Sequence, residues 1–273
     1  RHLTAARVTD LAFDRTQARA RLSDGRTVVA PLAVGADGKE SPSRRAAGIA
    51  AHRWGYGQTA LAFALAHTQP HRNVSTEFHR EGGPFVLVPL PGRHSSVVWV
   101  ARTPVAETML GLDARAFRAA VQARTRGILG EVTVLGPCGR FTVETLIAQR
   151  YVAPRLALIG EAAHALPPIG AQGLNLGLTD VATLTEVVVA ALRDGADPGS
   201  LEVLSAYERR RRPDVVARVY AIDALNRAVM TRLAPLKALR HLGLAATTRI
   251  GPLRAALMRQ GMTPLGPKPA MLE

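Results

Sequence analysis

The stretch from Leu156 to Asp180 constrains the fold of this chain more than any other segment. It reads LALIGEAAHALPPIGAQGLNLGLTD. It opens with a short apolar run, which is typical of a buried strand in a parallel sheet, and this run leads into Gly160-Glu161. Ligands of open α/β sheets bind at the carboxyl ends of the strands, so Glu161 is placed where a carboxylate can accept hydrogen bonds from sugar-like hydroxyls.

A loop of rigid and small residues joins this strand to a long helix. Pro167-Pro168 and Gly170 precede a periodic apolar pattern that continues to Asp194-Gly195. The predicted apolar stripe consists of Leu174, Leu178, Val181, Leu184, Val188 and Leu192. Free N–H groups around Gly173, Leu174 and Asn175 would form a partly positive helix end, which suits an anion. A plain turn into a helix is the alternative, but the ordered strand, acid, Pro-Pro pair and glycines favour a ligand site.

The N-terminal part of the chain predicts a small antiparallel sheet followed by a second loop of interest. Turn residues Ser23 to Arg26 separate strand-like runs between residues 6 and 34, and a buried strand is expected at 32–35. Asp37-Gly38 follows it directly, and Ser41 with Pro42 predicts the start of a short capped helix. An Asp-Gly pair after a strand is more often a turn than a binding site, so this motif is weak by itself.

The middle of the chain changes to strand-like runs separated by Pro and Gly. Residues 54–102 predict a second, largely antiparallel sheet. Asp113 predicts the cap of a helix that ends near Arg126, and residues 131–135 and 141–147 predict two further strands. A helix is then expected after Asp197-Pro198, with an interruption near Pro213.

Composition excludes several classes of protein. Among 273 residues, 47% are hydrophobic, and Cys138 is the single cysteine, so a disulfide framework and a cysteine zinc site are ruled out. No histidine cluster has metal-ligand spacing, so no metal is expected. The formal charge of +14 could indicate nucleic acid. However, three of the 35 basic residues are lysines, the others are dispersed arginines, and aromatic residues make up 4%, so we expect no nucleic-acid partner.

The segment from Leu156 to Asp180 resembles the second flavin-binding signature of the FAD-dependent aromatic hydroxylases, the p-hydroxybenzoate hydroxylase-like family. By this resemblance, Gly160 and Glu161 take the role of a Gly-Asp pair on the ribityl chain of FAD, although glutamate departs from the usual aspartate. The resemblance further implies that six residues lie against the flavin: Pro168, Gly170, Gln172, Gly173, Leu174 and Asn175. Asp37 and Gly38 resemble the motif near the FAD pyrophosphate and the path of the nicotinamide cofactor.

Further segments are most similar to ubiquinone-biosynthesis hydroxylases of the UbiH/UbiF type. These are GPFVLVPLP at 83–91, SVVW at 96–99, the Tyr207-Glu208-Arg209 to Arg212 run and the C-terminal PLRAALMRQGM. The resemblance implies an α/β fold: an FAD/NAD(P)-binding Rossmann-like domain, an inserted antiparallel-sheet substrate domain and C-terminal helices. The family's Gly-x-Gly-x-x-Gly unit is missing, so the FAD domain is expected to be incomplete at its N-terminus and the chain alone to hold FAD loosely.

The expected domains are residues 1–50 and 151–195 for FAD, 51–150 for the substrate, and 196–273 as a helical region. The implied function is hydroxylation of an aromatic ring, with FAD as cofactor, NAD(P)H and dioxygen as co-substrates, and a polyprenyl phenol of ubiquinone biosynthesis as substrate. Tyr56, Phe85 and Pro89 are the expected substrate-pocket residues, and no catalytic residue is assigned.

Three alternatives stay open at this point. One is another flavin-dependent oxidoreductase of the same fold: a phenol or polyketide hydroxylase, a halogenase or a reductase. Another is a truncated, non-catalytic partner, and the third is a basic nucleic-acid-binding module. The expected location is cytoplasmic, with peripheral contact at the inner face of the membrane or in a ubiquinone-biosynthesis complex, because a polyprenyl substrate has to be drawn from lipid.

Overall fold

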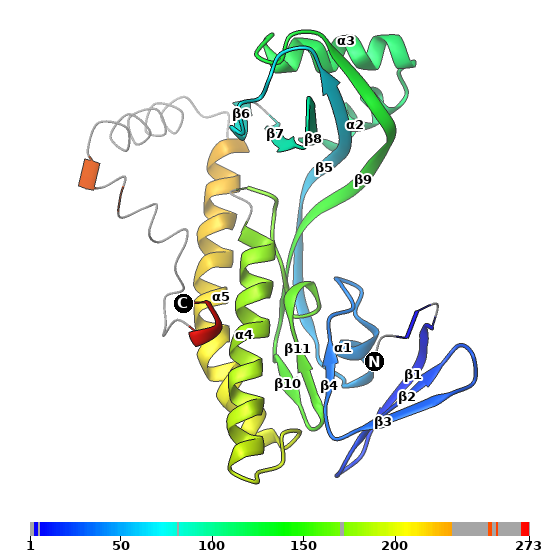
Figure 1. Ribbon diagram of the computed structural model, residues 1–273, viewed down its shortest axis with the longest axis vertical. Helices are drawn as coiled ribbons and strands as arrows, with labels where there is room; N and C mark the ends of the chain where they lie inside the picture. Colours follow the sequence, from blue (N-terminus) through cyan, green and yellow to red (C-terminus); the bar gives the residue numbers. More distant parts are fainter. Residues whose placement is uncertain are drawn as a thin grey trace. The chain divides into compact units, whose positions relative to one another are not determined.

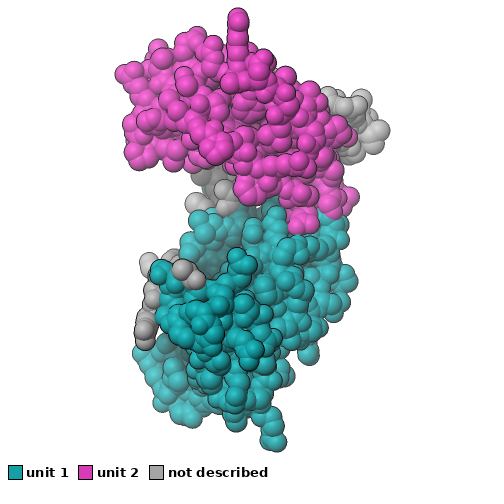
Figure 2. Space-filling view, turned by 90° about the vertical axis from the view of Figure 1, so that its right-hand side faces the viewer, with its two compact units in different colours: residues 1–54, 145–223, 242–273 teal, residues 55–144, 224–241 magenta. Residues whose placement is uncertain are grey.

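The computed structural model describes residues 3–4, 6–80, 82–169, 172–230, 251–252, 255 and 269–272. The chain divides into two compact units (Figure 2). Unit 1 contains residues 1–54, 145–223 and 242–273, and unit 2 contains residues 55–144 and 224–241. The substrate domain was predicted at 51–150, whereas unit 2 begins at Gly55, ends its first segment at Glu144 and takes in residues from the predicted C-terminal helical region.

Two small sheets lie wholly within unit 1 (Figure 1). The first is an antiparallel meander of β1 (Val8–Phe13), β2 (Ala18–Leu22) and β3 (Thr27–Ala30). The second has the order β10-β11-β4, from Val152–Ala153, Leu156–Leu158 and Ala33–Gly35. β4 and β11 pair in parallel, which confirms the parallel strand predicted after Arg155. The expectation that the β4 segment is buried is wrong at Val34, which is 47% exposed because β4 is an edge strand in this sheet.

Three α-helices belong wholly or largely to unit 1: α1 (Pro42–Ala46), α4 (Gln172–Arg193) and α5 (Leu201–Met230). The side chain of Ser41 accepts a hydrogen bond from the N–H of Arg44, which confirms the predicted cap of α1. The predicted interruption at Pro213 is wrong, because α5 continues through it. Leu204 and Tyr207 before the proline and Val215 and Val219 after it are fully buried, so packing on both sides outweighs the lost backbone hydrogen bond.

Most residues of the apolar stripe predicted for α4 do not lie on the buried face of the helix. Leu174, Leu178, Val181 and Leu192 are exposed, while the buried face carries Leu176, Asp180, Ala182, Thr183, Leu184 and Ala191. Apolar residues occur on several sides of this helix, so their spacing alone did not identify the packed side. Among the described helices, α4 is long and apolar enough to cross a membrane, a test that the core helix of a soluble protein also passes.

Unit 2 is built on long antiparallel strands that enter it from unit 1. They are β5 (Ala51–His67) and β9 (Val132–Ala148), and with β6 (Thr76–Arg80), β7 (Gly83–Leu90) and β8 (His94–Arg102) they confirm the predicted antiparallel sheet. The sheet order is β12-β9-β5-β8-β7-β6, with β12 at His164–Ala165. The two strands predicted over 131–147 are one strand, because β9 continues through Gly136, whose left-handed φ of +65° glycine adopts readily.

Helices α2 (Thr103–Leu110) and α3 (Ala114–Thr125) complete unit 2. Oδ1 of Asp113 accepts a hydrogen bond of 2.8 Å from the N–H of Ala116, which confirms the predicted cap of α3. Leu61, Phe85 and Trp99 lie in register on β5, β7 and β8 and form the core together with these helices. The other face of the sheet carries a smaller cluster that includes Ala60, with Tyr56 packed against it. Unit 2 therefore has one closed, helix-covered face.

Candidate functional site

The Gly160-Glu161 pair forms a tight turn where β11 ends. The turn continues as the 3-10 helix η1 (Gly160–Ala162). Gly160 has a left-handed φ of +56°, and a Cβ at this position would meet no atom within 4 Å. Backbone conformation, and not crowding, therefore favours glycine here. Glu161 is exposed, and its carboxylate has no hydrogen bond or ion pair within the described part of the chain.

The first turn of α4 faces solvent close to this glycine. A Cβ on Gly177 of α4 would lie 3.5 Å from Cα of Gly160, so the helix approaches the turn closely. Gly173, Leu174 and Asn175 are all exposed, and Leu174 is 73% exposed. The first N–H groups of a helix have no acceptor within the helix, and they carry its positive end. Pro168 is half-buried, and Gly170 lies outside the described residues.

Asp180 fixes the turn to the helix. This carboxylate is fully buried, and its Oδ2 accepts hydrogen bonds from the N–H of Gly160 at 3.0 Å and from Nε2 of His164 at 2.7 Å. Its Oδ1 accepts a hydrogen bond of 2.8 Å from Nε of Arg211. One side chain therefore joins α4, α5 and both ends of the turn. His164 contacts this carboxylate in the buried interior, as expected for a structural histidine.

A second carboxylate extends this ionic cluster along α5. Arg211 also donates to Asp214 at 2.8 Å, and Asp214 accepts a hydrogen bond of 3.0 Å from Arg218. Burial lowers the pKa of Arg211, but the charges and hydrogen bonds of Asp180 and Asp214 outweigh this effect and raise it above its ordinary value. The arginine run at 209–212 thus braces helices, since Arg210 also pairs with Glu186 at 2.6 Å.

The Asp37-Gly38 motif forms a capped turn. Asp37 accepts hydrogen bonds from the hydroxyl of Ser41 and from the N–H of Ser43, and Gly38 has a left-handed φ of +79°. Burial raises the pKa of Asp37, but these hydrogen bonds outweigh it and hold the pKa below its ordinary value. The carboxylate therefore has a structural role in starting α1, whatever it contacts in addition.

Arg44 links the two motifs. Its buried guanidinium donates to the carbonyl of Ala162 at 2.7 Å and to the carbonyl of Lys39 at 2.6 Å. These carbonyls belong to the Gly160 turn and to the loop that follows Gly38. Two sequence segments that lie far apart in the chain therefore meet through one side chain, as the predicted combination of motifs requires.

These features together form a polar site at the carboxyl end of parallel strands, and comparison with known proteins identifies the family of the chain. The family model of the FAD binding domain matches residues 3–222. The chain belongs to this family. Within the FAD binding domain, the Asp37-Gly38 and Gly160-Glu161 motifs both lie in the matched region.

Relatives agree with this assignment. The chain is 43% identical over 99% of its length to ubiquinone hydroxylase UbiL of Rhodospirillum rubrum, and it covers 63% of that protein. It is 31% identical over 88% of its length to 3-demethoxyubiquinol 3-hydroxylase of Escherichia coli, and it covers 61% of that protein. The chain thus spans less than two thirds of the length of these curated relatives.

A solved structure confirms the fold. The p-nitrophenol 4-monooxygenase PnpA of Pseudomonas putida matches 94% of this chain and 66% of its own chain with a TM-score of 0.76, at 18% sequence identity. The α/β flavin-monooxygenase fold predicted from the sequence is therefore confirmed.

The residues of the FAD binding domain fit the cofactor at the Gly160 turn. An exposed carboxylate, a left-handed glycine with open space around it and an exposed helix start lie together there. Polyol hydroxyls can donate to Glu161, and an anionic ring edge suits the helix N–H groups. Within the described residues, no group of His, Cys, Asp and Glu is arranged to hold a metal ion.

The structure does not bring the three expected substrate-pocket residues together. Phe85 is fully buried in the helix-covered core, with its ring centroid 5.8 Å from that of Trp99. Tyr56 lies on the other face of the sheet, where the guanidinium of Arg227 stacks 5.6 Å from its ring centre. Pro89 is half-buried near the end of β7. Tyr56 and Phe85 therefore do not face a common pocket, because the register of the sheet places them on opposite faces.

Two features were missed in the sequence. Asp180 stands four residues from both Leu176 and Leu184, so helical spacing places this acid on the same buried face of α4. An acid at such a position indicates a buried partner and could have been noticed in the sequence. The second is a buried amide pair in unit 2, in which Nδ2 of Asn226 donates to Oε1 of Gln58 at 3.1 Å. No sequence signal connected these two residues, which are far apart in the chain.

Proposed function

We propose that this chain supplies the ribityl- and ring-binding part of the FAD site, and the substrate domain, of an FAD-dependent aromatic-ring hydroxylase that uses NAD(P)H and dioxygen. The observation that carries the proposal is the Gly160-Glu161 turn, which Asp180 holds against the exposed first turn of α4. The family match and the hydroxylase names of the relatives support it.

The residues of the chain would act as follows. Glu161 accepts hydrogen bonds from the ribityl hydroxyls, and the N–H groups of Gly173, Leu174 and Asn175 face the ring edge. Pro168 in the preceding loop and Gln172 at the start of α4 lie beside the ring, and the backbone around Asp37 and Gly38 approaches the pyrophosphate. When bound, FAD supplies the redox and oxygen chemistry, while the protein orients it and excludes water.

The proposed substrate class is a polyprenyl phenol of ubiquinone biosynthesis. Both curated relatives carry ubiquinone chemistry in their names, and one is 43% identical to this chain over 99% of the chain's length. Within unit 2, the sheet face that carries Tyr56 and the Gln58–Asn226 pair is the better candidate for ring binding. The opposite face is filled by the core around Phe85 and Trp99.

A turnover assay tests this function. The protein, together with any residues encoded upstream of Arg1, is loaded with FAD and supplied with NADH or NADPH, isotopically labelled dioxygen and a short-chain prenyl phenol. We expect one labelled oxygen atom in the phenol ring, as detected by mass spectrometry. Glu161→Ala should lower turnover through loss of FAD, and Glu202→Ala, an exposed acid on α5, is the matched control. Product without label, or no turnover with FAD bound, would overturn the proposal.

We further propose a cytoplasmic protein with peripheral contact at the inner face of the membrane. The excess of 35 Lys and Arg over 21 Asp and Glu favours anionic lipid, and the apolar tail of the proposed substrate resides in lipid. Flotation with anionic vesicles at low salt should recover the protein, and flotation with neutral vesicles should not. Failure to recover the protein with either kind of vesicle would overturn the proposed membrane contact.

A further inference from the structure

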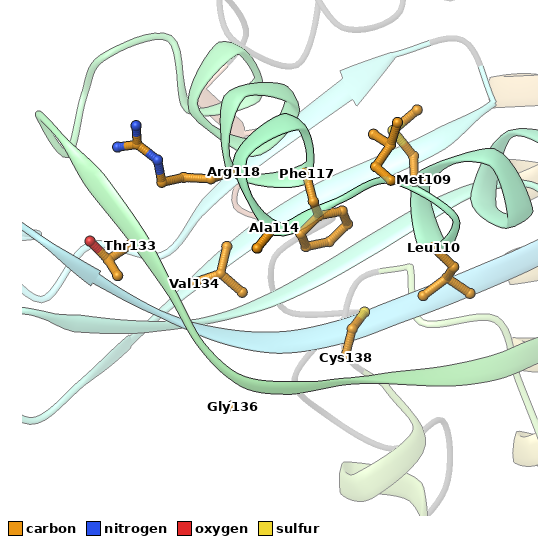
Figure 3. A pocket seen from close by; sticks show the side chains of 10 residues that line it. Met109, Leu110, Ala114, Phe117, Arg118, Thr133, Val134, Gly136 and Cys138 are labelled. Atoms are coloured by element: carbon orange, nitrogen blue, oxygen red, sulfur yellow. The ribbon is translucent and has the colours of Figure 1, made fainter.

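A cavity in unit 2 lies on the helix-covered side of the sheet (Figure 3). Its volume is about 470 Å³, within the range of roughly 300–1,000 Å³ that small-molecule pockets occupy. Segments of α2, α3, the loop between them and β9 line it. The apolar lining consists of Met109, Leu110, Leu112, Phe117, Val134 and Cys138. These side chains are half-buried, so part of each faces the cavity.

The floor of this cavity is continuous with the core of unit 2. Met109, Leu110, Phe117, Val134 and Cys138 all pack against the buried cluster around Trp99. A ligand in the cavity would therefore cover apolar surface that belongs to a packed core. Met109 is unbranched and adapts to ligand shape, which suits a flexible chain more than a rigid ring.

The two ends of the cavity differ in polarity. Figure 3 shows Arg118 and Thr133 near one end and Met109, Leu110 and Cys138 near the other. Arg118 has an ion pair of 3.8 Å with Glu131, whose side chain is 77% exposed. Such a long, solvated pair contributes little, so the guanidinium keeps the capacity to bind a second carboxylate. The cavity thus has a cationic end and an apolar end.

We propose that this cavity binds an amphiphile with an acyl or isoprenoid chain and a carboxylate head. The chain lies along Phe117, Val134 and Leu110, and the head pairs with Arg118 at the polar end. Leu61 and Phe85 fill the sheet behind the cavity, whereas Tyr56 lies on the other sheet face, so this site is separate from the proposed ring-binding face. The proposal does not depend on FAD.

Displacement of a fluorescent fatty acid tests the site. The whole chain is titrated with cis-parinarate, and then palmitate, farnesoate or hexadecanol is added below the concentration at which each forms micelles. We expect palmitate, farnesoate or both to displace the probe, which identifies an acyl or an isoprenoid source. Hexadecanol should compete at least about tenfold more weakly, because it lacks the charge that pairs with Arg118.

Matched variants on α3 locate the binding. Arg118→Ala should weaken parinarate binding about tenfold, and Arg115→Ala, an exposed arginine on the same helix that does not line the cavity, should leave it unchanged. Ala114→Trp should fill the cavity and abolish binding. If that variant does not fold, as judged by circular dichroism, the Arg118 and Arg115 pair decides the question.

The single cysteine gives an independent readout. Cys138 lines the apolar end, so bound palmitate should slow its reaction with a maleimide several-fold in the wild-type chain and in Arg115→Ala. Unchanged labelling together with no parinarate binding would overturn the proposal. Binding that is equal in Arg118→Ala and Arg115→Ala, or equal competition by hexadecanol and palmitate, would overturn the carboxylate head.

Discussion

Units 1 and 2 are stabilised at their centres by different interactions. In unit 1, the carboxylate of Asp180 accepts directional bonds from Gly160, His164 and Arg211 in a fully buried position. In unit 2, the centre consists of aromatic and aliphatic side chains, with the ring of Phe117 5.3 Å from that of Phe63 and 6.5 Å from that of Trp99. The centre of unit 1 fixes the positions of its atoms by hydrogen bonds, and the centre of unit 2 is stabilised by the packing of apolar side chains.

The difference follows from what each region has to position. A turn that holds a cofactor needs its backbone in one place, and directional bonds to a buried charge achieve this at a high desolvation cost. Apolar packing depends on volume and tolerates related side chains. We therefore expect unit 1 to be sensitive to the chemistry of a substitution and unit 2 to its size.

The largest effect is expected at Asp180. Asp180→Asn keeps the shape but removes the charge that compensates Arg211, so it should lower the free energy of unfolding by about 3 kcal/mol. Urea unfolding followed by circular dichroism measures the loss. Asp194→Ala, which removes an exposed acid just beyond the end of α4, is the control and should change stability little. If Asp180→Asn lowers the free energy of unfolding less than Asp194→Ala does, the ionic cluster does not stabilise unit 1.

A smaller loss is expected at Phe85, although this ring is fully buried. Phe85→Leu keeps an apolar side chain in the core and should cost about 1–1.5 kcal/mol in the same unfolding experiment. Phe141→Leu, at a 58% exposed ring of unit 2, should be near neutral. If Phe85→Leu destabilises the protein more than Asp180→Asn, the contrast between the two centres is wrong.

The effect at Asp37 should be about 1 kcal/mol and should depend on pH. Its pKa is lowered in the folded protein, so its contribution is present above the ordinary carboxyl pKa and is lost as pH falls through the lowered value. Asp37→Ala should therefore be less stable than wild type at pH 7 and nearly equal to it in acid. Asp10→Ala, at an exposed acid on β1, should show no such convergence. If the difference in the free energy of unfolding between wild type and Asp37→Ala stays constant across pH, the effect does not arise from the charge of Asp37.

The sequence predicted the parts of the fold that depend on local patterns. Ser41 and Asp113 as helix caps, the hairpin at Asp24-Gly25 and the parallel strand before Gly160 all follow from short-range chemistry, and the structure confirms them. The FAD motif was readable because strand, acid and helix start occur in one continuous segment. Local order in the chain therefore located the candidate site.

The errors arose where tertiary packing decides. Pro213 stays inside α5 because buried residues flank it, and the packed face of α4 contains Asp180 in place of the more apolar residues around Leu178. Tyr56 and Phe85 were grouped because both belong to the sheet predicted over residues 54–102, but their side chains face opposite sides of the sheet. Strand parity and long-range partners cannot be read from runs of apolar residues alone.

The affinity for FAD of Glu161 variants tests the central claim most directly. Flavin fluorescence is titrated with the wild-type chain, Glu161→Gln, Glu161→Ala and the control Glu202→Ala, each carrying any residues encoded upstream of Arg1. We predict that Glu161→Ala weakens FAD binding about tenfold, that Glu161→Gln retains part of it, and that Glu202→Ala equals wild type. An unchanged FAD affinity in Glu161→Ala, with the fold intact, would contradict the assignment of the Gly160-Glu161 turn as the cofactor site.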